Sequence, residues 1–516
     1  MRHKLDFVLP ILFFFVYFAW STVLPMDKAP DEWMRYLIPL YIFDNGTLPL
    51  GDDPAIMSQN WGTSYGFQPY GASLIGFFFM KVTSFFTTDE AALLIATRQV
   101  STISAAITVF LSIRIGHELF SSKFSPYLLG IFVGLLPQFV FLASYLNNEA
   151  FMLMCIALIV YAWVLGIENG WSTKVCVLLG VGLGLCAESY YFAYGYILVS
   201  ILVYFVSAVH QMRHGYAVGV RRNFTGEGTV SPDVPAQIRK ARNVRKSHGA
   251  IWAGALLILV VAVAVGGWFF VRNGLLYHGD IFGMATSDQT AEIYAAPDFK
   301  PSNHLSPDDY GVSPIQMMFG DPSAWNDKGA TWFSTTVKSF FAVFGYLNVK
   351  MGAWFYRTYL VLYGVGLVLL PLRFFRKKTS TGEKTFAFAL LACFVLGVAL
   401  AVYYSWASDY QARGRYLMST LIPLLIGVCG GYDALADKLA GLGKKPEQEP
   451  VGAHSVPSQQ GVRIMHDGLA VRMLGMPARA WSWADILLVL VAVAVVALFV
   501  WTLQDAILPK CIGGVL

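Results

Sequence analysis

The chain has 516 residues, of which 56% are hydrophobic and only 13% are charged. Soluble domains carry about 25% charged residues, so this composition excludes a soluble particle and indicates an integral membrane protein. The net charge of +5 is modest and lies mainly on particular loops, which indicates membrane topology and not nucleic-acid binding.

Apolar runs long enough to cross a bilayer, which takes about 20 residues, predict about eleven spans along the chain. They fall at residues 6–24, 90–115, 124–146, 149–168, 174–192, 194–212, 250–271, 356–374, 385–405, 414–432 and 481–503. The first run resembles a signal peptide but lacks a small-residue cleavage site, so we expect it to stay as an uncleaved span. A twelfth run, 70–86, is short and contains two glycines and Lys81.

Basic segments set the predicted sidedness of these spans, because short loops rich in Lys and Arg stay in the cytoplasm. Three segments qualify: the N-terminus up to Lys4, residues 213–249 with eight Lys or Arg, and residues 373–378. All three face the cytoplasm only if an even number of spans separates the first two. The run 70–86 is therefore predicted to lie at the outer interface or to re-enter from outside.

This parity predicts two large outer loops, about 25–89 and about 272–355. Residues 1–432 are expected to form one transmembrane module. Residues 433–480, which are rich in Lys, Glu, Gln and Pro near their start, are expected to form a cytoplasmic linker. Residues 481–516 would then add the last span and an outer tail.

The first outer loop opens with Pro30-Asp31-Glu32-Trp33, followed by apolar residues at helical spacing. This pattern predicts an amphipathic helix on the outer membrane surface, with Asp31 and Glu32 at the membrane–water boundary. Partial desolvation there would raise the basicity of a carboxylate, and a base that takes a proton from an acceptor hydroxyl is what inverting glycosyl transfer requires. The simpler interpretation is that Asp31 caps the helix and pairs with Arg35.

The Pro-Asp-Glu-x-x-x-Tyr stretch resembles the Asp-Glu motif of the GT-C glycosyltransferases, which include protein mannosyltransferases and aminoarabinose transferases. Four further stretches are similar to this superfamily in the same order along residues 1–432. They are Arg98 to Ser101, Asn147-Asn148-Glu149, Trp268 to Asp280, and Gln411-Ala412-Arg413-Gly414-Arg415-Tyr416, which is similar to the Gln-Gly-Arg-Tyr signature of a bacterial branch.

The resemblance implies an all-α GT-C fold with juxtamembrane helices in the first outer loop and a polyprenyl-phosphate sugar as donor. It also implies roles for particular residues. Asp31 is the expected base, with Glu32 and Glu149 as nearby acids. The expected donor-phosphate ligands are Arg413, Arg415, Arg98 and Arg272, and further pocket residues are Glu188, His278 and Asp280.

Two features leave alternatives open. Relatives often carry a lysine where Glu188 follows a Gly-Leu-rich stretch, so either the phosphate is neutralised by arginines elsewhere or the donor differs. A divalent cation could sit between Asp31 and Glu149, although a third preorganised ligand is not visible in the sequence. The six cysteines lack metal-ligand spacing, so no zinc site is predicted.

We therefore predict a multi-pass glycosyltransferase of the bacterial cytoplasmic membrane with its active site facing outside. Its expected partners are a polyprenyl-phosphate sugar, membrane lipids and a glycan, lipid or protein acceptor, and no nucleic acid. A transporter or flippase of lipid-linked glycans is the main alternative. Transporters usually carry internal repeats, which this chain lacks. A non-catalytic component of an envelope-polysaccharide system is the second alternative.

Overall fold

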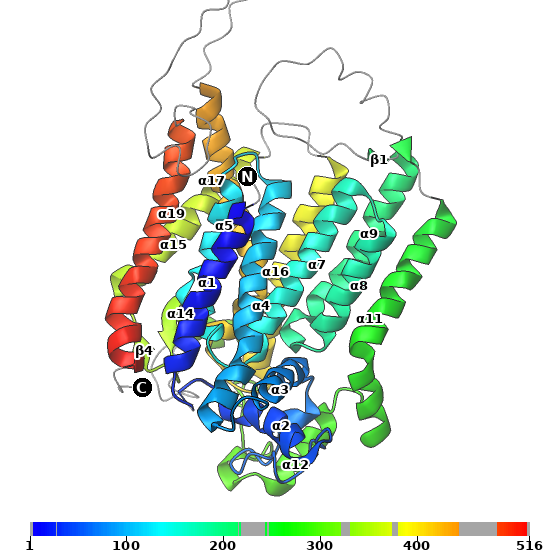
Figure 1. Cartoon of the computed structure of the whole chain (residues 1–516), viewed down its shortest axis with the longest axis vertical. Coiled ribbons are helices and arrows are strands. Elements are labelled where there is room, and N and C mark those ends of the chain that lie inside the picture. Colours follow the sequence, from blue (N-terminus) through cyan, green and yellow to red (C-terminus); the bar gives the residue numbers. More distant parts are fainter. Residues whose placement is uncertain are drawn as a thin grey trace, which may run out of the picture.

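The computed structural model describes residues 4–26, 28–214, 216–217, 243–244, 247–320, 331–373, 380–442 and 482–512. Most of the basic segment 213–249, three of the basic residues after Arg373, and the linker from residue 443 onward lie outside these ranges. Most of the described chain is helical (Figure 1).

Nine helices among the described residues are long and apolar enough to cross a membrane, and this confirms the predicted all-α polytopic class. They are α1 (Lys4–Val23), α4 (Glu90–Leu119), α7 (Asn148–Asn169), α9 (Tyr194–His214), α11 (His248–Leu276), α15 (Ala353–Leu369), α16 (Thr381–Ala407), α17 (Leu421–Leu442) and α19 (Trp483–Thr502).

Shorter elements complete the bundle and its loops. The α-helices are α2 (Glu32–Asn45), α3 (Gly71–Thr83), α5 (Ser125–Gly134), α6 (Pro137–Leu142), α8 (Thr173–Ala187), α12 (Met284–Tyr294), α13 (Pro314–Phe319) and α14 (Trp332–Ala342). The 3-10 turns are η1 (Tyr65–Phe67), η2 (Tyr191–Ala193), η3 (Pro297–Phe299), η5 (Leu370–Arg373) and η6 (Gly414–Thr420), and η7 (Leu503–Ile512) is a π-helix. Two antiparallel pairs join β1 (Tyr216–Ala217) to β2 (Asn243–Val244) and β3 (Val343–Phe344) to β4 (Val349–Lys350).

Three predicted spans differ from the observed helices. The run 124–146 is two helices, α5 and α6, because Pro137 lacks an N–H and begins a new helix. The run 174–192 ends as a helix at Ala187. The span predicted at 414–432 begins with η6, and its α-helix runs from Leu421 to Leu442, ten residues into the predicted linker.

The predicted relation between the loops and the ends of the bundle is visible in Figure 1. The start of α1, the end of α9 and the start of α11 lie at one end, and α2, α3 and α12 lie at the opposite end. The short run 70–86 is α3, which packs beside α2 and α4 at that second end. This helix is therefore not a further full span, which agrees with the prediction from the parity of the spans. We refer to this end as the loop end.

A buried ion pair fixes α2 to the transmembrane bundle. Glu32, at the start of α2, accepts two hydrogen bonds of 2.7 Å from Nε and Nη2 of Arg98 on α4. Arg98 also donates to the carbonyls of Ser21 and Leu24 at the end of α1, and Glu32 accepts from the Leu146 N–H. Both side chains are essentially inaccessible to solvent. This pair therefore holds α1, α2 and α4 in one arrangement.

The long loop that follows α11 is attached to the end of α16 by polar contacts. His304 is 3.1 Å from the carboxylate of Asp409, and Asp409 accepts a hydrogen bond from Gln411. The indole of Trp406 donates to the Val312 carbonyl, and the Asp308 N–H donates to the Trp406 carbonyl. The loop is thus connected to the same short segment that leads into η6.

We predict that Glu32→Gln and Arg98→Gln each destabilise the protein, because either change leaves its partner as an unpaired buried charge. Removing one member of a buried ion pair costs about 3–5 kcal/mol. The thermal unfolding temperature of the purified variants checks this. Glu90→Gln, at the exposed start of α4, is the control and should unfold like the wild type. An Arg98→Gln variant as stable as the wild type would contradict this structural role.

We also predict that the His304–Asp409 contact makes a pH-dependent contribution to the stability of the loop that follows α11. Its hydrogen bond with Asp409 raises the pKa of His304, and partial burial opposes this. A raised folded-state pKa means that the contribution is complete below the unfolded pKa of about 6.5 and is lost as the pH rises through the folded pKa. Protection of residues 300–312 from proteolysis should therefore decline with rising pH in the wild type and stay flat in His304→Gln. His278→Asn, at an exposed histidine of the same loop, should behave like the wild type.

Candidate functional site

Two carboxylates and one guanidinium meet at the loop end of the bundle. Nη2 of Arg415 lies 2.6 Å from Oδ2 of Asp31, and Nε of Arg415 lies 3.7 Å from Oε1 of Glu149. Arg415 also donates to the hydroxyl of Tyr416. Three distant parts of the sequence, the starts of α2 and α7 and the 3-10 turn η6, therefore contribute one charged cluster.

Asp31 differs from the other members of the cluster in its backbone and its exposure. It precedes α2 with φ 65° and ψ 3°, in the left-handed region, and its side chain does not cap the helix. Its side chain is 26% exposed, whereas that of Glu149 is 1% exposed. Asp31 is thus the carboxylate of the cluster that solvent can reach. Asp31 occupies the N-cap position of α2, as the simpler interpretation of the sequence expected, but its side chain does not cap the helix and forms its ion pair with Arg415 and not with Arg35.

The charge state of Asp31 also differs from the sequence-based expectation. Burial raises the pKa of Asp31, but the nearby guanidiniums of Arg415 and Arg35 outweigh burial, and the pKa lies below the ordinary value of an aspartate. Arg413 contributes in the same direction. The expected increase in basicity is therefore wrong for this arrangement, and Asp31 is an ionised, paired carboxylate.

Glu149 occupies the first turn of α7, after Asn147, whose side chain accepts a hydrogen bond from the Ala150 N–H. Both carboxylate oxygens of Glu149 are buried, and neither has a hydrogen-bond partner among the described residues. A buried carboxylate without such partners is costly. Glu149 therefore has two acceptor atoms to which no described residue donates a hydrogen bond.

Backbone packing positions Arg415. The Gly414 N–H donates to Oγ of Ser339 at 2.7 Å, and a Cβ at Gly414 would lie 2.1 Å from the backbone nitrogen of Phe340. Any side chain at residue 414 would collide with α14. Glycine therefore allows the segment between Arg413 and Arg415 to run directly against α14, and this brings the Arg415 side chain to Asp31.

The other residues predicted for the site, all of which the structure describes, do not form ion pairs with the cluster of Asp31, Glu149 and Arg415. Glu32 and Arg98 satisfy each other inside the bundle, and their hydrogen-bonding atoms are occupied in this structure, which leaves them unavailable for the predicted roles in catalysis and phosphate binding. Arg413, half-buried at the start of η6, makes no side-chain hydrogen bond or ion pair with a described residue.

The predicted pocket residues Glu188, His278 and Asp280 are not brought to the charged cluster by any contact within the described ranges. Asp280 accepts hydrogen bonds from the N–H and hydroxyl of Thr286, and His278 is exposed with φ 54°. Both shape the turn after α11. Glu188 is buried beside Gly71, whose N–H donates to its carbonyl, and its carboxylate has no hydrogen-bond partner among the described residues.

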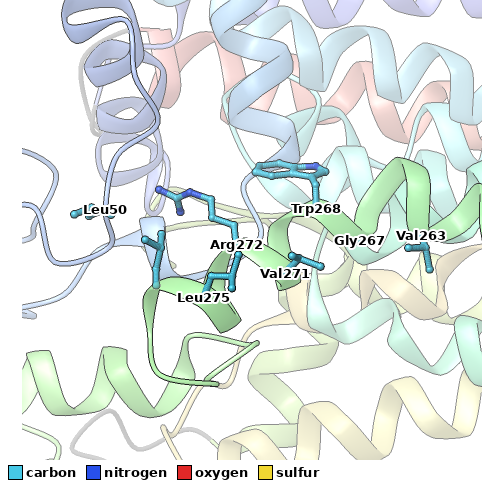
Figure 2. A pocket seen from close by; sticks show the side chains of 8 residues that line it. Leu50, Val263, Gly267, Trp268, Val271, Arg272 and Leu275 are labelled. Carbon is cyan, nitrogen blue, oxygen red and sulfur yellow. The ribbon is translucent and has the colours of Figure 1, made fainter.

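Arg272 lies in a groove of about 640 Å³ along the C-terminal half of α11 (Figure 2). The remaining lining is apolar and comprises Leu50, Val263, Gly267, Trp268, Val271, Leu275 and Leu276. Nη2 of Arg272 donates to the Pro49 carbonyl at 2.6 Å, and its buried Nη1 has no hydrogen-bond partner among the described residues. No contact in the described chain joins Arg272 to Asp31 or Arg415, so the four predicted phosphate ligands do not form one set.

Arg35 and Tyr65 belong to the site but were not among the site residues predicted from the sequence. The Arg35 guanidinium carbon lies 4.1 Å above the centre of the Tyr65 ring and 6.0 Å from that of Tyr190. The i, i+4 spacing of Asp31 and Arg35 indicated proximity, but nothing in the sequence pointed to the tyrosine of η1. No cluster of three or more His, Cys, Asp or Glu in metal-binding arrangement occurs among the described residues.

Comparison with solved structures identifies two groups of membrane transferases. The crystal structure of the oligosaccharyltransferase of Archaeoglobus fulgidus in its apo form matches with 14% identity and a TM-score of 0.48. The match covers 96% of this chain and 55% of that chain, so this chain spans about half the length of that protein. ArnT from Cupriavidus metallidurans, bound to undecaprenyl phosphate, matches with 15% identity and a TM-score of 0.34, covering 88% of this chain and 84% of that chain.

Comparison by sequence gives a family for the chain. A search of curated proteins finds no match. A family model described as "Predicted membrane protein (DUF2142)" matches residues 73–425, which is more than half of the sequence and includes Arg98, Glu149 and Arg415. The chain belongs to the DUF2142 family of predicted membrane proteins.

Proposed function

We propose that this protein is a glycosyltransferase that moves a sugar from a polyprenyl-phosphate donor to an acceptor hydroxyl at the loop end of the bundle. The observation that carries the proposal is the bridging of Asp31 and Glu149 by Arg415. A partly exposed carboxylate beside a buried guanidinium supplies the two groups that such a transfer needs, a base for the acceptor and a cation for the leaving phosphate.

The proposed reaction is one displacement. The acceptor oxygen forms a bond to the anomeric carbon while its proton passes to the Asp31 carboxylate. The bond between the anomeric carbon and the phosphate oxygen breaks, and the electron pair leaves with the polyprenyl phosphate. Attack from the face opposite to the leaving group inverts the anomeric configuration.

Arg415 has two tasks in this scheme. At rest it pairs with Asp31 and keeps that carboxylate ionised but weakly basic. A donor phosphate competes with Asp31 for the same guanidinium, because arginine binds phosphate by paired charge-assisted hydrogen bonds. As Arg415 turns toward the phosphate, Asp31 loses a positive neighbour and becomes a stronger base. Donor binding would in this way activate the base.

Glu149 is assigned to orientation. Its two unpartnered oxygens can accept hydrogen bonds from hydroxyls of the acceptor or the transferred sugar. A divalent cation between Asp31 and Glu149 would compete with Arg415 for the same oxygens, which makes the guanidinium the simpler counter-charge. The membrane sidedness of the reaction follows from the basic segments of the sequence: the loop end faces outside the cytoplasm of a bacterial cell.

We predict that Asp31→Asn abolishes sugar transfer from a labelled polyprenyl-phosphate sugar, because the amide cannot accept the acceptor proton. A loss of roughly 100-fold or more is expected for a general base. The assay uses purified protein in membranes, with protein level and unfolding temperature as controls. Asp44→Asn, at an exposed acid of the same helix, should transfer normally.

The outcomes of this assay separate the three classes of function. Transfer that depends on Asp31 supports the proposal, and retained transfer in Asp31→Asn removes Asp31 as the base. Movement of the lipid-linked sugar across the membrane without transfer would indicate the transporter alternative. Neither transfer nor movement would indicate a non-catalytic envelope component.

We also predict that the loop end is accessible from outside the cell. A cysteine at exposed Gln59, in the first outer loop, should react with a membrane-impermeant maleimide on intact spheroplasts. A cysteine at exposed Lys174, at the start of α8, should react only after the membrane is opened. The reverse pattern would place Asp31 in the cytoplasm and overturn the proposed orientation.

A further inference from the structure

Arg35 is a buried cation whose guanidinium makes no hydrogen bond with any described residue. The residue is 4% exposed, and it lies one turn into α2. Arginine is rarely buried unless it is paired, because its five N–H groups lose their hydration. The described structure gives this guanidinium two aromatic neighbours and no acceptor.

The aromatic neighbours explain how Arg35 is held. The Tyr65 ring, 4.1 Å from the guanidinium carbon, lies within the distance of a cation–π contact, and the Tyr190 ring lies at the limit of that distance. A guanidinium that rests on the face of a ring is fixed in orientation, while its N–H groups, which lie in its own plane, stay available at its edge. This arrangement positions Arg35 without using its donors.

Two further groups near Arg35 have unused polar atoms. Nε of Arg415 is buried and has no hydrogen-bond partner among the described residues, and the same holds for both oxygens of Glu149. The charges of Glu149 and Asp31 act on Arg35, but neither carboxylate forms an ion pair with it. The site therefore contains two cations that each have N–H groups to which no described residue offers a hydrogen-bond acceptor.

We infer that Arg35 and Arg415 form a two-armed clamp for the phosphate group of a lipid-linked donor. The inference rests on the proposed function and identifies which residues hold the leaving group. A phosphate has terminal oxygens in a tetrahedral arrangement and can accept from two guanidiniums at once, whereas a carboxylate is matched by one. Two cations also offset the cost of bringing a phosphate into a largely buried site.

This clamp replaces the phosphate set expected from the sequence. Arg98 is occupied by Glu32, and Arg272 lies in the groove on α11. Arg35 and Arg415 come from opposite ends of the sequence, yet the charges of both act on Asp31, the proposed base. A phosphate between the two guanidiniums would therefore be held beside the carboxylate that takes the acceptor proton.

The test measures binding of undecaprenyl phosphate to the purified full chain in nanodiscs and needs no turnover. Arg35→Gln should weaken binding by roughly tenfold to a hundredfold, because it removes charge-assisted hydrogen bonds. Arg35→Lys, which keeps the charge but loses the planar fork, should fall between Arg35→Gln and the wild type. Arg357→Gln, at an exposed arginine of α15, is the matched control and should bind like the wild type.

Variants of Tyr65 test the positioning of Arg35 without changing a charge. Tyr65→Phe keeps the aromatic face and should bind undecaprenyl phosphate normally. Tyr65→Leu removes that face and should weaken binding in the same direction as Arg35→Gln. An equal loss of undecaprenyl phosphate binding in Tyr65→Phe and Tyr65→Leu would contradict the cation–π role, because the removal of the hydroxyl is the only change that the two variants share.

Two further ligands identify the chemical group that is bound. Undecaprenol has the same chain without phosphate, and its binding should not change in Arg35→Gln. Inorganic phosphate tests whether the headgroup suffices, and we expect much weaker binding than for the lipid phosphate. The inference is overturned if the wild type does not bind undecaprenyl phosphate, if Arg35→Gln binds it like the wild type, or if Arg35→Gln loses undecaprenol equally.

The binding assay and the transfer assay can fail separately. If undecaprenyl phosphate binding depends on Arg35 but the protein transfers no sugar, the clamp is supported and the proposed transferase activity is rejected. If Arg35→Gln transfers sugar with an unchanged KM for the donor, the transferase activity is supported and the phosphate-binding role of Arg35 is rejected.

Discussion

The site depends on the opposite directions taken by two adjacent carboxylates. Glu32 is directed into the bundle and is held by Arg98, while Asp31, with φ 65°, is directed to Arg415. A left-handed conformation is uncommon for a residue other than glycine, although aspartate tolerates it better than most. Such a conformation costs about 1 kcal/mol or more and persists only where the surroundings enforce it. Here two ion pairs hold the adjacent residues, the buried Glu32–Arg98 pair and the Asp31–Arg415 pair.

The two acids of the Asp-Glu motif therefore have different roles: Glu32 anchors α2, and Asp31 is the proposed base. Because Glu32 accepts hydrogen bonds from both Arg98 and the Leu146 N–H, its position is tied to α4 and to the turn before α7. That turn leads directly to Glu149 at the start of α7. The same anchor thus sets the positions of Asp31 and Glu149, the two acids that share Arg415. In this arrangement Glu32 is a positioning residue.

Much of the fold follows from the sequence by simple physics. Long apolar runs predict the spans, and the distribution of Lys and Arg predicts which ends share a side, because both depend on local transfer free energies. The break between α5 and α6 was missed because Leu135, Leu136 and Pro137 are all tolerated in an apolar run. The extension of α17 was missed because its last turns are too polar to count as a span, although they continue the helix.

The candidate site was predicted only in part, for a physical reason. A motif indicates which residue types are present, but the choice among arginines depends on proximity in space. Arg98 and Arg415 were both candidates by sequence. Only the fold shows that Arg98 is occupied by Glu32, whereas Arg415, 384 residues from Asp31, reaches Asp31 and Glu149. The Gly414 contact with Phe340 and the Arg35 contact with Tyr65 likewise join distant segments that no spacing rule connects.

The charge balance of the cluster links donor binding to the chemistry in the proposed reaction. Arg35 and Arg415 balance Asp31 and Glu149, so the resting site is neutral overall, apart from the half-buried Arg413. In that state Asp31 has a lowered pKa and is a poor base. A donor phosphate adds negative charge and competes for the two guanidiniums, so it shifts the pKa of Asp31 upward when a sugar is in place. Such coupling would keep Asp31 a poor base until the donor is bound. It requires one residue that pairs with Asp31 at rest and also binds the phosphate, and Arg415 is placed to do both.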